Sequence, residues 1–222
     1  MTMRNYDKID NHLDELAKDL YPQPVDPAHT SWAEAAISQF SIGFADDTDT
    51  VLDVGCGEGF CQPLFAELDI EWTGVTLGKH DYGEAKKRGT VYNYDASFMP
   101  FEDSSYDMIF ARHILEHSPM PLITLMEWHR IASKYLLLVF PAPEYWLYYG
   151  KNHYHMMNKE QLWWLLARAG WEIYDRYDFT TEHKAYMDFY MLDNPPKDRV
   201  WHGPPQIVEY RILCEKGEPQ TE

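Results

Sequence analysis

Hydrophobic and polar positions along this 222-residue chain change period several times, and each change predicts a new element of secondary structure. Apolar residues first recur at helical spacing over Tyr6–Leu20, which predicts an amphipathic helix. Three prolines follow this segment and end the helix, and a second helix is predicted to start after Thr30 or Ser31 and to run to about Phe40.

From residue 50 onward, short apolar runs alternate with amphipathic segments. Strands are predicted at 50–54, 71–76, 91–95, 106–111, 134–140, 171–180 and 206–215. Helices are predicted at 60–68, 79–88 and 119–132, and a further one between an N-cap pair, Asn158 with Gln161, and Gly170. This alternation favours an α/β three-layer sandwich with a Rossmann-like, seven-stranded, mostly parallel sheet. No helical pattern joins the last two strands, so an antiparallel strand is expected at the sheet edge.

The first strand leads directly into a turn with three glycines at alternate positions, Gly55, Gly57 and Gly59, and a helical pattern follows. Glycine in such a turn lets a ligand approach the backbone and its free N–H groups. The turn therefore predicts a nucleotide-like ligand at the first crossover of the sheet. The spacing is G-x-G-x-G rather than the G-x-G-x-x-G of dinucleotide-binding proteins, with Phe60 in the place of the third glycine.

Composition narrows the choice of partners. The formal net charge of −17 disfavours nucleic acid and anionic membrane surfaces, which bind mainly through Lys and Arg. Three scattered cysteines form neither a disulfide framework nor a metal-binding pattern. The N-terminus is polar and charged, and the chain has no apolar run of membrane-spanning length. The protein is therefore expected to be soluble and cytoplasmic, and it is expected to be a monomer or a homodimer.

Ligands of such sheets bind outside the carboxyl ends of the strands. Three segments stand at these ends: Asp53-Val54-Gly55-Cys56-Gly57-Glu58-Gly59, Asp95-Ala96 with Pro100-Phe101, and His113-x-Leu115-Glu116-His117. A fourth, Tyr106-Asp107-Met108-Ile109, begins the fourth strand and stands between the last two of these segments in the chain. Because these four segments occur together and in this order, the chain resembles the class I S-adenosylmethionine-dependent methyltransferases, and most closely those that act on small molecules. The resemblance covers roughly Val51 to Phe140 and is weaker beyond.

The resemblance implies roles for these residues. The turn Gly55-Cys56-Gly57 would pack against the methionine and ribose parts of S-adenosylmethionine, and Asp53 would hold the turn and the cofactor's amino group. Asp95 and the backbone N–H of Ala96 would contact the adenine. Arg112 or His113 would line the methyl-transfer centre. A residue at a strand end such as Asp95 can equally serve only its own turn.

The second strand departs from the family pattern. It ends in Thr76, where the family usually carries an acidic residue for the ribose hydroxyls. The run Gly74-Val75-Thr76-Leu77-Gly78 resembles a variant of cyclopropane fatty-acid synthase-like enzymes, in which a threonine and a polar residue five positions later share this role. Those residues are Thr76 and Asp81 here, and Leu77 lies beside them in the expected cofactor site.

Histidines are the candidate catalytic groups, because methyl transfer needs a general base when the nucleophile arrives protonated. His113 and His117 are four residues apart, and on a helical turn they would share one face. His153 and His155 follow the fifth strand and are further candidates. The four histidines would form a metal site only if these loops met. No recognisable carboxylate or cysteine partner accompanies them, so no metal is expected.

Substrate contacts are expected from aromatic residues in two segments. Tyr145, Tyr149 and Tyr154 lie beyond the fifth strand, and Trp32, with His29, lies in an N-terminal helical lid. The predicted organisation is a lid or cap over residues 1–45, a cofactor-binding methyltransferase domain over 46–216 and a tail over 217–222. The predicted function is methyl transfer to an O, N or C atom of a small organic molecule. The alternatives are a non-catalytic cofactor-binding protein of this fold and an NAD-type nucleotide enzyme.

Overall fold

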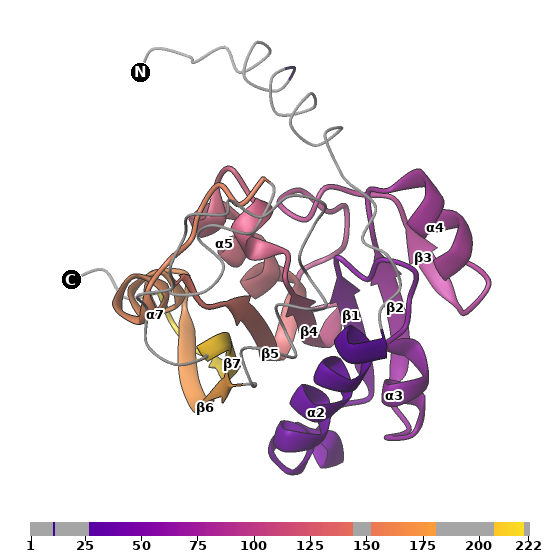
Figure 1. Ribbon diagram of the computed structural model, residues 1–222, viewed down its shortest axis with the longest axis horizontal. Coiled ribbons are helices and arrows are strands. Elements are labelled where there is room, and N and C mark those ends of the chain that lie inside the picture. The colour runs from indigo at the N-terminus through magenta and orange to yellow at the C-terminus, as the bar shows by residue number, and fades with distance from the viewer. Residues whose placement is uncertain (1–10, 12–26, 144–151, 181–206, 220–222) are drawn as a thin grey trace, which may run out of the picture.

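A computed structural model of the chain describes Asn11 and residues 27–143, 152–180 and 207–219 (Figure 1). Its α-helices are α2 (Pro27–Phe44), α3 (Gln62–Ala66), α4 (Lys79–Ala85), α5 (Pro121–Ile131) and α7 (Lys159–Arg168), and its short 3-10 helices are η1 (Ala45–Asp47) and η2 (Leu115–His117). Its strands are β1 (Thr50–Val54), β2 (Glu71–Val75), β3 (Thr90–Tyr92), β4 (Tyr106–Arg112), β5 (Ala132–Pro141), β6 (Trp171–Thr180) and β7 (Ile207–Lys216).

The seven strands form one sheet in the order β3-β2-β1-β4-β5-β7-β6. The first five strands in this order are parallel, and β7 runs antiparallel to both β5 and β6. The chain reverses its direction of strand addition at β1 and β4, so their carboxyl ends are the switch point at which ligands of such sheets bind.

Helices cover both faces of the sheet, and successive strand residues pack alternately on the two sides. One core contains α5 and α7 residues together with Leu52, Ile109 and Leu138. The other contains residues of α2, α3 and α4 together with Val51, Met108 and Val139. Figure 1 shows α2 and α3 next to each other on one side of the strands and α5 on the other. The predicted three-layer α/β sandwich is confirmed.

The predicted antiparallel pairing at the sheet edge is confirmed, since the edge strand β6 pairs antiparallel with β7, and β7 lies one position inside the edge. β7 is buried over seven successive residues, Val208 to Cys214, and therefore needs a neighbour on each side. β6 carries exposed Glu172, Asp175 and Arg176, which suit an edge because charged side chains oppose pairing with further strands.

Most predicted elements shift only at their ends. The third strand ends at Tyr92 rather than Asp95, because the Asp95 side chain accepts a hydrogen bond from the Ser97 backbone N–H at 2.7 Å and so forms a turn. The predicted N-cap pair is confirmed, since the Asn158 side chain accepts from the Gln161 N–H at the start of α7.

The described part of the N-terminal segment packs on the sheet. Ala36, Ile37, Phe40 and Phe44 of α2 are buried in the core that contains Val51 and Leu213. The predicted helix over 6–20 lies outside the described residues, apart from Asn11. Within the residues described, no helix combines the length and the apolar character needed to cross a membrane.

Candidate active site

In the turn after β1, the backbone of Gly57 has no neighbouring atoms on the side where a side chain would stand. Gly55 and Gly57 have positive φ angles of 77° and 52°, a conformation that glycine adopts without the strain other residues incur. The backbone N–H groups of Gly55 and Cys56 both donate to the Val75 carbonyl, at 2.8 and 3.0 Å, which anchors the turn to β2. A Cβ at Gly57 would meet no atom within 4 Å. A ligand can therefore approach the backbone at this position.

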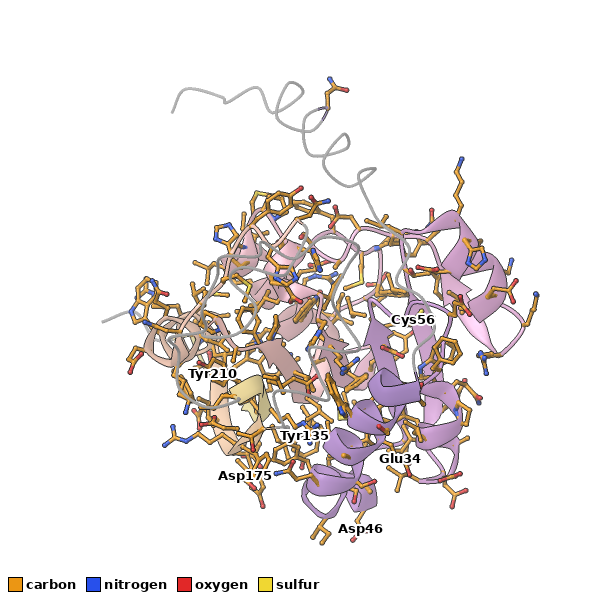
Figure 2. All side chains as sticks on the ribbon, viewed as in Figure 1. Glu34, Asp46, Cys56, Tyr135, Asp175 and Tyr210 are labelled. Carbon is orange, nitrogen blue, oxygen red and sulfur yellow. The ribbon has the colours of Figure 1, made fainter. Side chains whose placement is uncertain are left out.

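Cys56, between these glycines, is a buried thiol. Its Sγ lies 3.6 Å from the Gly57 carbonyl, and burial raises the thiol pKa. The side chain is thus a small packing residue and no thiolate nucleophile. Figure 2 shows Cys56 at the end of β1 and Tyr210 far from it on β7, with β4 and β5 between these strands in the sheet.

Asp53 on β1 is buried and bound to Trp72 of β2. One carboxylate oxygen, Oδ2, accepts a hydrogen bond from the indole Nε1 at 2.9 Å. Gly74, which pairs with Asp53 in the sheet, leaves room for the indole, because a Cβ there would come within 2.6 Å of the Trp72 ring. Burial raises the Asp53 pKa to about 7, against the opposing effects of the Trp72 hydrogen bond and the Arg112 charge. Asp53 therefore ties β1 to β2 two residues before the glycine turn begins.

The segment after β2 is held in place by hydrogen bonds to its backbone carbonyls. Thr76 is buried, and the side chain of Asn93 donates to the carbonyls of Thr76 and Leu77 at 2.7 and 3.0 Å. Asp81 is in the first turn of α4, with its Oδ1 3.5 Å from Nδ1 of His80. Thr76 and Asp81 thus both lie past the carboxyl end of β2, where the ribose contacts were predicted.

The predicted adenine contacts follow β3. Besides its turn with Ser97, Asp95 makes an isolated bridge with Phe98. The Ala96 carbonyl accepts a hydrogen bond from Trp128 Nε1 of α5 at 2.9 Å. The loop is therefore fixed to the helix layer, and one oxygen of Asp95 serves the turn.

A buried charge network lies at the carboxyl end of β4. Glu209 of β7 has no exposed surface, and its Oε1 lies 2.8 Å from Arg112 Nη2 and 3.0 Å from His113 Nε2. Its Oε2 accepts from the Arg211 guanidinium at 3.3 Å. Burial alone would raise the Glu209 pKa, but the surrounding Arg112, His113 and Arg211 hold it well below its ordinary value.

His113 and His117 do not share a helical face, contrary to the prediction. The His113 N–H still donates to Val139 in the sheet at 3.0 Å, and the chain then turns through a φ of 50°. The helical turn begins only at Leu115, so the His113 ring faces Glu209 while His117 faces the segment after β5. Burial lowers the pKa of both imidazoles, which favours their neutral form.

Two of the four candidate histidines meet. The rings of His117 and His153 are 4.9 Å apart between centroids, in an edge-to-face arrangement. His117 Nδ1 lies 3.0 Å from the Asn152 carbonyl. His155 turns elsewhere, with Nε2 3.3 Å from the Pro119 carbonyl. Burial, followed by the neighbouring His117 and His113, lowers the His153 pKa to about 3.

The predicted substrate residues divide between described and undescribed segments. The Trp32 carbonyl on α2 accepts a hydrogen bond from Arg211 at 3.2 Å, which ties α2 to the charge network. Tyr154 is 39% exposed, and its N–H donates to the Glu116 carbonyl at 2.8 Å. Tyr145, Tyr149 and the side chain of His29 lie outside the described residues.

Residues 52–139, from β1 to β5, match a family model described as "Methyltransferase domain". This segment contains the glycine turn, the Asp95 loop and the ends of β4 and β5 described above. Residues 52–139 form a methyltransferase domain.

Two curated proteins that are similar in sequence to this chain are also named as methyltransferases. The chain is 36% identical over 75 residues to an uncharacterised methyltransferase of Mycobacterium sp. (strain JLS), covering 32% of this chain and 30% of that protein. It is 32% identical over 91 residues to a ubiquinone biosynthesis O-methyltransferase of Nitrosospira multiformis, covering 37% and 38%. The matches thus span about a third of the length of these curated relatives.

The fold also matches solved structures. A SAM-dependent methyltransferase from Archaeoglobus fulgidus superposes with a TM-score of 0.66 at 20% sequence identity. The superposition covers 84% of this chain and 94% of that one. At this identity the likeness concerns the fold, which extends well beyond the segment matched by the family model.

The sequence analysis gave no role to three residues of the candidate site. Glu209 and Arg211 were overlooked although they interrupt the apolar strand Ile207–Leu213, and charged residues inside such a strand signal a buried ion pair. Glu116 was noted in the motif with His117 but was assigned no role. Its complete burial is visible only in the tertiary structure.

Proposed function

We propose that the protein transfers a methyl group from S-adenosylmethionine to an O, N or C atom of a small organic molecule. The glycine turn carries this proposal, because Gly57 combines a left-handed backbone with open space at the switch point of a methyltransferase domain. A small acceptor agrees with the net charge of −17, which disfavours nucleic acid. It also agrees with the ubiquinone biosynthesis O-methyltransferase among the relatives.

The residues present fit this cofactor. The N–H groups of Gly55 and Cys56 are used by the Val75 carbonyl, so the turn is rigid before a ligand arrives. We assign the methionine and ribose parts to Gly55, Cys56 and Gly57, with Asp53 supporting the turn. Thr76, Leu77 and Asp81 would hold the ribose, and Asp95 and Ala96 the adenine. When bound, S-adenosylmethionine supplies an electrophilic methyl group for in-line displacement.

The chain's own contribution is positioning and proton transfer. The network of Arg112 and Glu209 holds the end of β4 rigid beside the reacting centre, which keeps the acceptor in line. His117 donates its Nδ1 hydrogen to Asn152, because a carbonyl can only accept. Its Nε2 then carries the ring lone pair, the atom that we assign to take a proton from the acceptor. Trp32, Tyr145, Tyr149 and Tyr154 would enclose the acceptor, with His113, His153 and His155 as further polar groups.

Calorimetric titration of the purified protein tests the cofactor first. We expect binding of S-adenosylmethionine and S-adenosylhomocysteine in the micromolar range and no binding of NADH. Binding of NADH alone would contradict the assignment. Transfer of radiolabelled methyl to a panel of phenols, amines and carboxylic acids then tests turnover. Cofactor binding without transfer to any acceptor would favour a non-catalytic cofactor-binding protein.

His117→Ala separates catalysis from binding. We expect lower turnover with nearly unchanged affinity for S-adenosylhomocysteine, because His117 faces Asn152 rather than the glycine turn. His129→Ala is the matched control, since its Nε2 binds the Gly217 carbonyl away from the switch point. Equal activity of the His117 variant and the native protein would show that His117 is structural.

A further inference from the structure

Three potential metal ligands meet beside the carboxyl end of β4. Glu116 and His117 belong to η2, and His153 follows β5. One ligand atom from each residue lies within 4.8 Å of the other two. Glu116 is fully buried, and the other two residues are partly buried. The cluster combines two imidazoles with a carboxylate, the donor set of many mononuclear metal sites.

Glu116 is the observation that points to a cation. Neither of its carboxylate oxygens has exposed surface or forms a hydrogen bond with any residue that the structure describes. Burying an ionised carboxylate is costly unless a hydrogen bond, an ion pair or a metal compensates it, and without one the group takes up a proton. Arg112, the nearby guanidinium, is already bound to Glu209 at 2.8 Å. A bound cation would provide the missing compensation.

The orientation of His117 fits the same role. Its Nδ1 donates to the Asn152 carbonyl, so Nε2 carries the lone pair. This Nε2 lies 3.9 Å from Glu116 Oε1, which is too far for a hydrogen bond. Two atoms that each lie about 2.1 Å from one ion are separated by about 3–4 Å at ordinary coordination angles. A metal-bound histidine also commonly donates its other N–H to a carbonyl, as His117 does.

The third ligand is held in place by the backbone. The N–H groups of Tyr154 and His155 both donate to the Glu116 carbonyl, at 2.8 and 3.2 Å. These bonds fasten the segment after β5 to η2, and the His153 ring lies 4.9 Å from the His117 ring between centroids. The three donors are therefore gathered by the fold rather than by sequence spacing, since 36 residues separate His117 from His153.

We propose that Glu116, His117 and His153 bind one divalent first-row transition-metal ion. Three protein ligands leave open coordination positions, as in catalytic zinc sites and in iron sites with two histidines and one carboxylate. If the proposed methyl transfer holds, on which this further step rests, an open position would take the acceptor oxygen. The ion would lower the pKa of that hydroxyl, and the hydroxyl proton would then pass to solvent. The ion would then take over the role assigned to His117 in proton removal, because the Nε2 lone pair of His117 would bind the ion.

Metal binding is tested on the full chain, free of any affinity tag and treated with a chelator. We expect calorimetric titration with Zn²⁺, and separately with Mn²⁺ and Co²⁺, to show one bound ion per chain. Glu116→Gln and His153→Ala should each weaken binding by at least about 100-fold. His155→Ala is the matched control and should bind as the native chain does, because its ring faces the Pro119 carbonyl.

Two further measurements keep the outcome decisive. Thermal unfolding with and without Zn²⁺ should show a stabilisation of the native chain and of His155→Ala that His153→Ala lacks. Absence of stoichiometric binding of all three ions would overturn the proposal, and so would equal loss in His153→Ala and His155→Ala. Titration of S-adenosylmethionine on the same samples separates the two proposals, because metal binding without cofactor binding would contradict only the methyl-transfer function.

Discussion

The Glu209 carboxylate of β7 lies 2.8 Å from the Arg112 guanidinium at the end of β4, although 97 residues separate them in the sequence. In the sheet, β5 lies between their two strands. The ion pair therefore spans the parallel part and the antiparallel part of the sheet. It brings the charge of the last strand to the carboxyl end of β4, beside the candidate reaction centre.

Glu209→Gln is expected to destabilise the protein strongly. Removing this charge leaves Arg112 and Arg211 buried without their counter-ion, and breaking a buried pair costs about 3–5 kcal/mol. Urea unfolding would measure the loss. Glu215→Gln on the same strand is the control, because Glu215 is exposed and should change stability little. Equal effects of the two substitutions would show that the network contributes no stability.

Gly57→Val is expected to reduce the affinity for S-adenosylmethionine by roughly 100-fold or more, since the side chain would fill the backbone approach and strain a left-handed residue by about 1–2 kcal/mol. Calorimetric titration measures the affinity. Gly83→Val is the control: a Cβ there also meets no atom within 4 Å, but Gly83 lies in α4 and has no positive φ. Unchanged affinity in Gly57→Val would contradict the assignment of the turn.

Asp53→Asn is expected to alter how stability depends on pH. Burial raises the Asp53 pKa to about 7 from 3.8, so between these values the folded protein holds a proton that the unfolded chain releases. Native stability should thus fall relative to the variant as pH rises from about 4 to about 7, and the difference should be constant above. The three-unit shift corresponds to at most about 4 kcal/mol.

Urea unfolding of both proteins without cofactor, across this pH range, measures the difference. The substitution leaves a side-chain oxygen that can accept from the Trp72 indole, so the comparison isolates the charge. Parallel stability curves for the two proteins would rule out a raised Asp53 pKa.

Asp107→Ala is expected to lower stability by about 2 kcal/mol or more, because hydrogen bonds to charged groups contribute about 1.5–3 kcal/mol. Asp107 Oδ2 accepts from the backbone N–H groups of Asp49 and Thr50 at 3.0 and 3.1 Å and so holds the start of β1 against β4. Burial opposes the effect, but these bonds, Ser133 and Lys134 lower the Asp107 pKa. Its contribution should therefore persist above about pH 4 and disappear as pH falls below it.

Thermal unfolding at pH 7 and pH 3 checks this expectation. Glu102→Ala is a suitable control, since Glu102 is exposed at the same end of β4. A destabilisation of Asp107→Ala that is equally large at pH 3 would mean that the carboxylate charge is not its source.

Local pattern predicted the elements well because it reflects local physics. The apolar run Thr50–Val54, the glycines after it and the Asn158 cap each specify a conformation through a few neighbouring residues. Strand ends were less accurate, since Asp95 leaves β3 through a side-chain hydrogen bond that the apolar pattern does not contain. The cofactor turn was predictable for the same reason as the strands: backbone geometry demands glycine there.

The sequence by itself thus determined the fold class and the glycine turn at the first crossover, both of which depend on short-range periodicity and backbone conformation. Only the tertiary structure decided that β7 lies inside β6, that Glu209 reaches Arg112, and that His117 meets His153 while His113 turns away. Those relationships join residues distant in sequence. They follow from which strands become neighbours and from which charges are buried together, and these are properties of the packed sheet as a whole.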